Sequence, residues 1–335
     1  MSTVIRTVPT MRMVAAAAGV GLKTVSRVVN GEPNVSPEIA ERVHDAIRRS
    51  GFRPNALARS LATGSSRTLA LVLPNISNPF HAGIYSGVEA VASENEYTVI
   101  LGGTAREAAR LHKYLDLAIS RRVEGVVLVG LALDGAEVSE FEKSGAGIVY
   151  LDCDAPGATG PSVHFDQRQV GKVGARHLVD LGRRAIAFIS GPEGLPVSDQ
   201  RVAGFRSALK AQKVPYDHHL VVHGDFTLHG GYAATRQLIE KHRFDGLLAA
   251  NDLMAVGALA ALAESGLTVP DDVAVVGMDD IELAKYTRPA LTTVKTDSLQ
   301  LGRIAAELMF RSLQGLDVSL TDQQLGAELV IRATA

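Results

Sequence analysis

The 335-residue chain contains no tryptophan and a single cysteine, Cys153. One cysteine excludes a disulfide within the chain and a cysteine-rich zinc site. Aromatic residues make up only 5% of the sequence, whereas 46% of it is hydrophobic, which favours an α/β body over a disordered chain. No apolar run is long enough to span a membrane, and the N-terminal residues do not read as a signal peptide. We therefore expect a cytoplasmic protein of two or three domains with no membrane partner.

Motifs of catalysis and nucleotide binding are also missing. The sequence has no GxSxG nucleophile elbow, no Walker A loop, no GxGxxG turn and no HExxH pair. The adjacent acids Asp279 and Asp280 follow a predicted strand, where hydrogen bonding to a ligand explains them better than acid–base chemistry or metal binding does. We expect no catalytic residue, no metal and no cofactor, and therefore no enzyme.

Charge is distributed unevenly along the chain. Residues 1–66 contain nine Lys and Arg but only four acids, a net charge of +5, although the whole chain has a net charge of −2. The remaining residues therefore carry a net charge of −7. A basic head on an acidic body is typical of a nucleic-acid-binding segment joined to a second unit.

A helix-turn-helix is predicted from Ala15 to Glu38. Thr10 can cap a first helix whose apolar residues fall at helical spacing, and Gly19 supplies a left-handed turn. Val25 and Val28 lie one turn apart on a second helix and face inward. In a helix-turn-helix this second helix enters the DNA major groove, although the spacing alone also fits an ordinary helical hairpin.

The outward face of the second helix is expected to carry Leu22, Lys23, Ser26 and Arg27. Ser36-Pro37-Glu38 predicts the start of a third helix, with Ser36 as its cap, that ends near Gly51. Beyond Pro54 a short helix from Asn55 to Leu61 is predicted, followed by a flexible Gly-Ser-Ser exit. This segment fits either a plain linker or a hinge that becomes helical only on DNA.

From Thr68 onward, strand-like apolar runs alternate with helical stretches. The predicted strands span residues 68–74, 97–103, 125–130, 147–152, 185–191, 246–251 and 273–279. The predicted helices span residues 79–95, 107–121, 168–182, 201–212, 228–242, 254–265 and 298–314. Continuous Val/Ile/Leu runs are typical of parallel strands buried on both faces. Because the pattern restarts after about residue 163, we expect two doubly wound α/β lobes with a cleft between them.

Polar residues follow several of these strands, at the edge where open α/β sheets bind ligands. They include Asp152, Asn251 and Asp279, with Arg201 and Phe226 in segments that follow other strands. Carboxylates, amides and an aromatic face together suit a polyhydroxylated small molecule.

The order of motifs resembles the LacI-type transcriptional regulators (LacI/GalR family) over nearly the whole chain. The matching segments are AGVGLKTVSRVVNG (18–31), VSPEIAERV (35–43), GFRPNALARSLATG (51–64), LPNISNPF (73–80), LDLAISRRVEGVVLVG (115–130), DQRVAGF (199–205), LLAANDLMAVGAL (247–259), VPDDVAVVGMDD (269–280), RPALTTVKTD (288–297) and ELVIRATA (328–335).

The resemblance implies a sequence-specific repressor that binds a near-palindromic double-stranded operator as a homodimer. Leu22, Lys23 and Arg27 would reach base edges. The residues expected to contact phosphates or fix orientation are Thr10, Thr24, Ser26, Asn30, Asn34, Ser36 and Asn55. The resemblance also favours the hinge, in which Leu61 would pry open a minor-groove base step with Ala58 packed beside it.

The resemblance further implies a helix-turn-helix domain over residues 1–53, a hinge helix and linker over 54–66, and a periplasmic-binding-protein-like effector and dimerisation domain over 67–335. Lobe one would take about residues 67–164 and 295–323, and lobe two about 165–294 and 324–335. A small effector, a sugar or sugar derivative, would bind between the lobes and control operator affinity. The implied contacts are Asn78, Phe80, Asp152, Arg201, Phe226, Asn251 and Asp279. The identity of the effector, and whether it induces or corepresses, stay open.

Two positions depart from the family pattern. Met13 stands where the family usually has Asp, and Gly21 stands where Ser or Thr usually caps the recognition helix. A glycine cap costs only a few tenths of a kcal/mol, roughly, relative to Ser. Two alternatives remain: a small-molecule binding protein or sugar-handling enzyme with an incidental helical head, and a DNA-binding protein whose body responds to a partner protein. The positive charge of the head argues against the first.

Overall fold

The computed structural model describes residues 9–29, 32–53, 65–143, 145–318 and 321–335. The chain divides into two compact units, Met1–Ser66 and Arg67–Ala335, and each is described by itself. Among the described residues, no helix combines the length and apolar character needed to cross a membrane. The predicted contacts Asn30, Asn55, Ala58 and Leu61 lie outside the described residues, so their roles stay predictions.

The N-terminal unit contains α1 (Met11–Ala18), α2 (Leu22–Val29) and α3 (Pro37–Ser50), as predicted. The Thr10 hydroxyl oxygen accepts a hydrogen bond from the Met13 N–H at 3.4 Å and caps α1. Gly19 ends α1 with a φ of 64°, a left-handed conformation that glycine adopts without strain. The three helices enclose a small apolar core of Val14, Ala15, Ala18, Val25, Val28, Val43, Ala46 and Phe52.

One detail of the predicted third helix is wrong. Ser36 occupies the N-cap position of α3, but its side chain makes no capping hydrogen bond. The helix start relies instead on Pro37, whose fixed φ suits the first helical position and which has no N–H to satisfy. Further along α3, Arg42 donates to the carbonyl oxygen of Ala18, which ties α3 to the end of α1.

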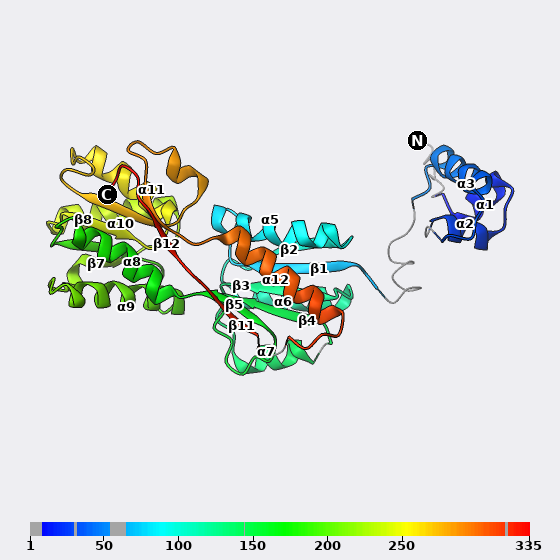
Figure 1. Cartoon of the computed structure of the whole chain (residues 1–335), viewed down its shortest axis with the longest axis horizontal. Helices are drawn as coiled ribbons and strands as arrows, with labels where there is room; N and C mark the ends of the chain where they lie inside the picture. The colour runs from blue at the N-terminus through cyan, green and yellow to red at the C-terminus, as the bar shows by residue number, and fades with distance from the viewer. Residues whose placement is uncertain (1–8, 30–31, 54–64, 144, 319–320) are drawn as a thin grey trace, which may run out of the picture. The chain divides into compact units, whose positions relative to one another are not determined.

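The C-terminal unit contains two six-stranded sheets (Figure 1). The first sheet has the strand order β11-β5-β4-β3-β1-β2 and all its strands are parallel. Its strands are β1 (Thr68–Leu73), β2 (Thr98–Gly103), β3 (Gly125–Val129), β4 (Gly147–Leu151), β5 (Ser162–Phe165) and β11 (Asp322–Leu325). The helices of this part of the chain are α5 (Pro79–Glu94), α6 (Ala108–Ser120), α7 (Gly135–Glu142) and α12 (Ser298–Leu313).

The second sheet has the strand order β12-β10-β9-β8-β6-β7. Its strands are β6 (Ile186–Ser190), β7 (Val221–His223), β8 (Gly246–Ala249), β9 (Ala274–Asp279), β10 (Thr292–Lys295) and β12 (Glu328–Val330). All pair in parallel except β12, which is antiparallel to β10. The accompanying helices are α8 (Gln167–Asp180), α9 (Pro196–Ala211), α10 (Leu228–Lys241) and α11 (Asp252–Glu264), together with short 3-10 turns η1 (His218–Leu220) and η2 (Glu282–Lys285). The prediction of two doubly wound lobes is confirmed, with β12 as an antiparallel exception.

Helices cover both faces of the first sheet. Along β1, Leu69 and Leu71 join the apolar cluster that includes α5 and α12, whereas Ala70 and Val72 join the cluster that includes α6. This alternation follows from the two-residue period of a strand. Burial on both faces explains why the strand reads as an uninterrupted apolar run.

The chain passes between the two sheets three times. After β5 it enters α8, after β10 it enters α12, and after β11 it enters β12 (Figure 1, where this last segment is red). These connections place the carboxyl ends of strands from both sheets along the same cleft, where the candidate site lies.

Candidate functional site

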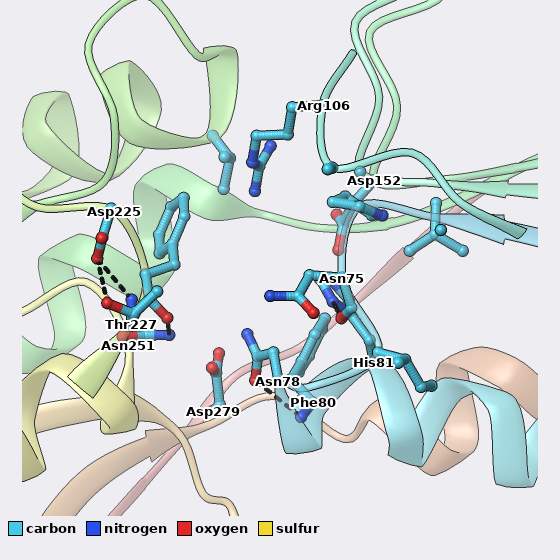
Figure 2. A pocket seen from close by; sticks show the side chains of 18 of the residues that line it. Asn75, Asn78, Phe80, His81, Arg106, Asp152, Asp225, Thr227, Asn251 and Asp279 are labelled. Carbon is cyan, nitrogen blue, oxygen red and sulfur yellow. Dashed lines mark hydrogen bonds between the residues drawn. The ribbon is translucent and has the colours of Figure 1, made fainter. Parts of the chain in front are cut away.

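The carboxyl ends of strands from both sheets border one cavity of about 490 Å³. All seven residues for which the sequence predicts effector contacts line this cavity: Asn78, Phe80, Asp152, Arg201, Phe226, Asn251 and Asp279. Figure 2 shows side chains from both lobes pointing toward a shared space. The volume lies within the range of ordinary small-molecule sites, about 300–1,000 Å³.

The segment after β1 forms one wall. The Asn75 side chain accepts the Ser77 N–H at 2.8 Å, and Asn78 caps α5 by accepting the Phe80 N–H at 3.0 Å. His81 places Nδ1 2.6 Å from the Asn75 carbonyl oxygen. Burial lowers the pKa of His81 to about 4, so the ring is neutral at physiological pH and donates from Nδ1 to that carbonyl. The wall is therefore rigid and uncharged.

A chain of polar contacts connects the two lobes beside the cavity. The Asp152 carboxylate, after β4 of the first sheet, accepts hydrogen bonds from the Phe165 N–H at 2.9 Å and from the Gln167 amide at 3.1 Å. The Gln167 side-chain oxygen in turn accepts from Arg201 Nε at 2.9 Å. Arg201, on α9, is only 5% exposed and also donates to the Ala250 carbonyl. Burial raises the pKa of Asp152, an effect that these hydrogen bonds and the Arg201 charge oppose.

Asp279, one of the acids that line the cavity, has a pKa far above its ordinary value. It ends β9, is 7% exposed, and has a φ of 113° that L-residues rarely adopt. Burial raises the pKa of Asp279 to about 7, although the nearby Arg201 guanidinium favours the carboxylate. Figure 2 shows the Asp279 carboxylate and the Asn78 amide among the groups that line the cavity. These groups can accept and donate hydrogen bonds to ligand hydroxyls.

The opposite wall carries an aromatic face. Phe226 follows β7 in a left-handed conformation with a φ of 64°, and its carbonyl oxygen accepts a hydrogen bond from the Asn251 amide at 3.1 Å. The Asn251 side-chain oxygen also caps α11 by accepting the Met254 N–H at 2.9 Å. Asn251 therefore lines the cavity, and its side-chain amide positions Phe226 through this hydrogen bond. From the other lobe, the Arg106 guanidinium carbon lies 5.4 Å from the centre of the Phe226 ring.

Several residues that line the cavity were not predicted from the sequence as effector contacts, among them His81, Arg106, Gln167, Asp225 and Thr227. The sequence does contain a signal for Asp225 and Thr227, because a threonine directly before a helical run is a typical N-cap. In the structure Thr227 caps α10, and the Asp225 carboxylate accepts the Thr227 N–H. No sequence signal indicated Arg106, because its position depends on positive φ angles at Ala105 and Arg106, and neither residue type favours that conformation.

In the N-terminal unit, α2 presents a polar face to solvent. Leu22 is 45% exposed, Lys23 is exposed, and Thr24, Ser26 and Arg27 are half-buried. Arg27 forms an ion pair with Glu32 at 3.4 Å. The other predicted DNA contacts in the described part of the head are also exposed: Thr10, whose hydroxyl caps α1, and Asn34 and Ser36. Val25 and Val28 are buried, which fixes the side of α2 that faces outward.

Each of the two units matches a known protein family. Residues 10–55 match the family described as bacterial regulatory proteins, lacI family, and residues 175–335 match the periplasmic binding protein-like domain. The chain is 37% identical over 334 residues to the HTH-type transcriptional regulator CelR of Thermobifida fusca, with 97% of each protein covered.

Solved structures of transcriptional regulators are similar to this chain over nearly its whole length. A structure of a CelR–cellobiose complex has a TM-score of 0.74 at 34% identity and covers 98% of this chain and 100% of its own. The lac repressor dimer bound to operator and the anti-inducer ONPF has a TM-score of 0.86 at 28% identity, with coverage of 98% and 99%. The chain thus belongs to the lacI family of bacterial regulatory proteins, and is a sequence-specific DNA-binding transcriptional regulator with a periplasmic-binding-protein-like effector unit.

Proposed function

We propose that the cavity binds a sugar or sugar derivative and that this effector controls the affinity of the head for operator DNA. The observation that carries the proposal is the convergence of seven predicted contact residues, drawn from both lobes, on a single cavity. Hydrogen-bonding groups such as Asn78 and Asp279 suit sugar hydroxyls, and the rings of Phe80 and Phe226 suit the apolar faces of a pyranose. The CelR–cellobiose complex makes cellobiose the first candidate.

The proposed action is repression, not catalysis. The polar groups of the cavity hold one another and the backbone in place, an arrangement that suits binding, and the relatives are transcription regulators. An effector that contacts both lobes favours one angle between them over another. Coupling of about 1–3 kcal/mol between the two sites suffices for a useful switch. The protein would act in the cytoplasm, where operator DNA is found.

We assign the chain to a DNA-binding domain over residues 1–53, a hinge and linker over 54–66, and an effector domain over 67–335. The chain would cross from one lobe to the other at the connections that follow β5, β10 and β11. In the head, Leu22, Lys23 and Arg27 would read bases, because α2 turns them away from the buried valines. The remaining predicted head contacts would bind phosphates.

We infer that the protein is a homodimer. β2 is an edge strand of the first sheet, and its Ile100 and Leu101 side chains are exposed. On the neighbouring α6, Leu117 and Ile119 are exposed as well. A second copy of the chain would cover this apolar edge and place two heads on the halves of a near-palindromic operator.

The test combines two measurements on the full chain. Cellobiose, ribose, a hexose phosphate and a purine nucleoside are screened by thermal shift; a ligand at 100 times its Kd adds about 2.7 kcal/mol of stability. Each hit is then added to a complex with operator DNA, whose dissociation is followed by fluorescence anisotropy. We expect a sugar to stabilise the wild type but not the Asp279→Asn variant, and to change operator affinity. If no small molecule stabilises the protein while its DNA binding is steeply salt-dependent, regulation by a partner protein becomes the better explanation.

A further inference from the structure

The turn that presents Asp279 to the cavity has an unusual backbone. Asp279 and the next residue, Asp280, have φ angles of 113° and 59°, although neither is glycine. Such conformations are costly for L-residues and persist only where the surroundings hold them. The turn follows β9 directly, so whatever holds it also sets the position of the Asp279 carboxyl group.

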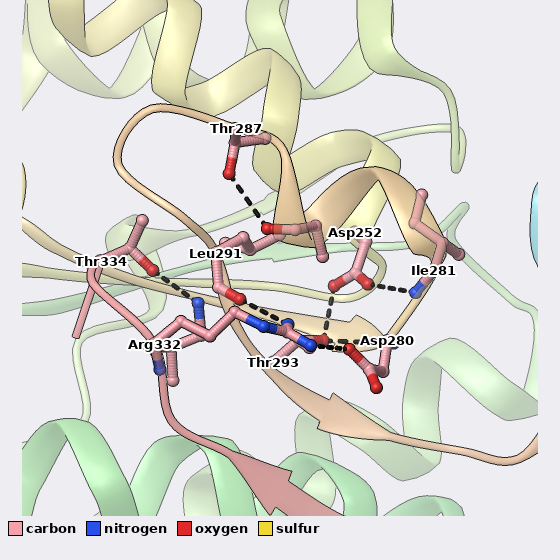
Figure 3. A network of polar contacts seen from close by, with 10 residues as sticks. Asp252, Asp280, Ile281, Thr287, Leu291, Thr293, Arg332 and Thr334 are labelled. Carbon is pink, nitrogen blue, oxygen red and sulfur yellow. Dashed lines mark hydrogen bonds and ion pairs between the residues drawn. The ribbon is translucent and has the colours of Figure 1, made fainter.

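One side of the turn is held by Asp252, the first residue of α11, which is completely buried. Its carboxylate accepts hydrogen bonds from the Ile281 N–H at 2.9 Å and from the Thr293 hydroxyl at 2.5 Å (Figure 3). Gly277 makes room for it, because a Cβ atom there would lie 2.2 Å from Asp252 Oδ1. These contacts fix the residue that follows the turn, but they leave the Asp280 side chain to another partner.

That partner comes from the end of the chain. Arg332 forms an ion pair with Asp280 at 2.5 Å, and both side chains are only 13% exposed. The same guanidinium donates to the Leu291 carbonyl at 2.8 Å, and the Arg332 N–H donates to the Thr292 hydroxyl at 2.9 Å. Figure 3 shows Arg332 reaching along the network to Asp280. Arg332 does not line the cavity.

We propose that Arg332 is a positioning residue of the effector site: its ion pair with Asp280 holds the strained turn that presents Asp279 to the effector. The proposal takes the cavity to be the effector site and so rests on the proposed function. A purely structural role would tie down the C-terminal segment without affecting Asp279. The two roles are separable because the guanidinium of Arg332 bonds to Asp280 and to the Leu291 carbonyl rather than to Asp279 itself.

The first measurement needs no effector. The Asp279 carboxyl group is titrated by carbon-13 NMR in protein labelled at aspartate, with Asp279→Asn to assign the signal. The titratable groups that act on it are Arg201, Asp152 and, from α11, Asp252, whose own pKa burial raises well above its ordinary value. Arg332 is not among the causes of its raised pKa, and removal of a cation by itself would raise an acid's pKa further. We expect Arg332→Gln to move the midpoint down from about 7 by at least one pH unit, because a relaxed turn exposes the carboxyl group to water.

The second measurement uses cellobiose as the probe, by calorimetry at pH 7.5. We expect Arg332→Gln and Asp280→Asn each to weaken binding at least tenfold, and the double variant to be no weaker than either, since all three lack the same pair. Asp280→Asn also covers the case in which Arg332→Gln does not fold. The matched control is Arg183→Gln, which likewise removes guanidinium bonds to loop carbonyls, those of Pro270 and Asp271, and should stay within twofold of the wild type.

The outcomes separate the two proposals. An Asp279 midpoint that is unchanged or raised in Arg332→Gln overturns the role of Arg332, whereas Asp280→Asn removes an adjacent anion and would lower the midpoint by itself. A wild type that does not bind cellobiose removes cellobiose as the effector, and the carboxyl titration then decides about Arg332 alone. Equal losses of affinity in Arg332→Gln and Arg183→Gln would reduce Arg332 to a general structural anchor.

Discussion

Replacing Asp279 by Asn should stabilise the free protein while removing effector binding. The carboxyl group is almost completely buried, and burial raises its pKa to about 7 from an ordinary value of 3.8. The folded protein therefore binds this proton more tightly than the unfolded chain does. Asn resembles the protonated acid in shape and cannot ionise, so it avoids the penalty that the buried carboxylate incurs.

The sign and size of the effect follow from linkage. Below about pH 3.8 both states hold the proton and Asp279 costs nothing. As the pH rises from 3.8 to 7, the unfolded chain loses the proton first and the free energy of unfolding falls. Above pH 7 the loss is complete, and a shift of about three pH units at 1.36 kcal/mol per unit gives about 4 kcal/mol. Between pH 5 and pH 8 the wild type should therefore lose about 3 kcal/mol that the variant keeps.

The assay is urea unfolding without effector at pH 5 and pH 8, followed by circular dichroism because the chain has no tryptophan. The quantity of interest is the difference between Asp279→Asn and the wild type at each pH, because the contributions of groups that do not interact with Asp279 cancel in it. We expect this difference to grow by about 3 kcal/mol toward pH 8. A difference that is the same at both pH values would refute the reasoning and mean that Asp279 is solvated or paired in the folded state.

Three further predictions concern the head, the helix packing and the hinge. Arg27→Ala should weaken specific operator binding at least tenfold more than binding to unrelated DNA, measured by fluorescence anisotropy; equal losses would make Arg27 a phosphate contact. Gly302→Ala should lower the free energy of unfolding by about 1–3 kcal/mol, because a Cβ atom there would lie 2.2 Å from the Ile84 carbonyl oxygen of α5. The control is Gly326→Ala, where a Cβ atom would have nothing within 4 Å. Equal stabilities of the two variants in urea unfolding would contradict the close packing of α12 on α5. Leu61→Ala should reduce DNA bending in a circular-permutation gel and leave sugar binding intact, and an unchanged bend would remove Leu61 as the minor-groove wedge.

Most of the strands that the sequence predicted are covered by helices on both faces, although the predicted edge strand β2 is largely exposed. β1, β3 and β9 each contain a continuous buried apolar run, and this local pattern identifies them. The strands missed are short or polar: β11 reads Asp-Gln-Gln-Leu, and β7 has three residues. β7 and β11 become strands because each pairs at an edge of its sheet, and no local pattern encodes that long-range pairing.

Helix starts were the other source of error. α9 begins at Pro196, five residues before the predicted start at Arg201. The signal was present, since proline is favoured at the first helical position, but the apolar spacing that guided the prediction begins later. α7 (Gly135–Glu142) was missed altogether, and it contains three glutamates and a serine within eight residues.

The cavity was more predictable than its details. Residues such as Asp152 and Asn251 could be placed from the rule that open α/β sheets bind ligands beyond their carboxyl ends. The positive φ angles at Arg106, Phe226 and Asp279 could not, because their residue types favour other conformations. These three residues nonetheless decide which way the walls of the cavity face. Their geometry is imposed by contacts with distant segments, and it becomes visible only in the folded chain.

The contacts across the cavity suggest how an effector acts on the lobes. The two lobes are linked by the Asp152–Gln167–Arg201 chain and by the Arg106 guanidinium over the Phe226 ring. A ligand shifts the lobe angle only if it binds one angle better than another. An effector that stacks on Phe226 competes with Arg106 for the ring, whereas one that leaves this contact in place adds to it. The same pair of residues thus supports either release from DNA or tighter binding, and the fit of the effector against Phe226 determines the direction.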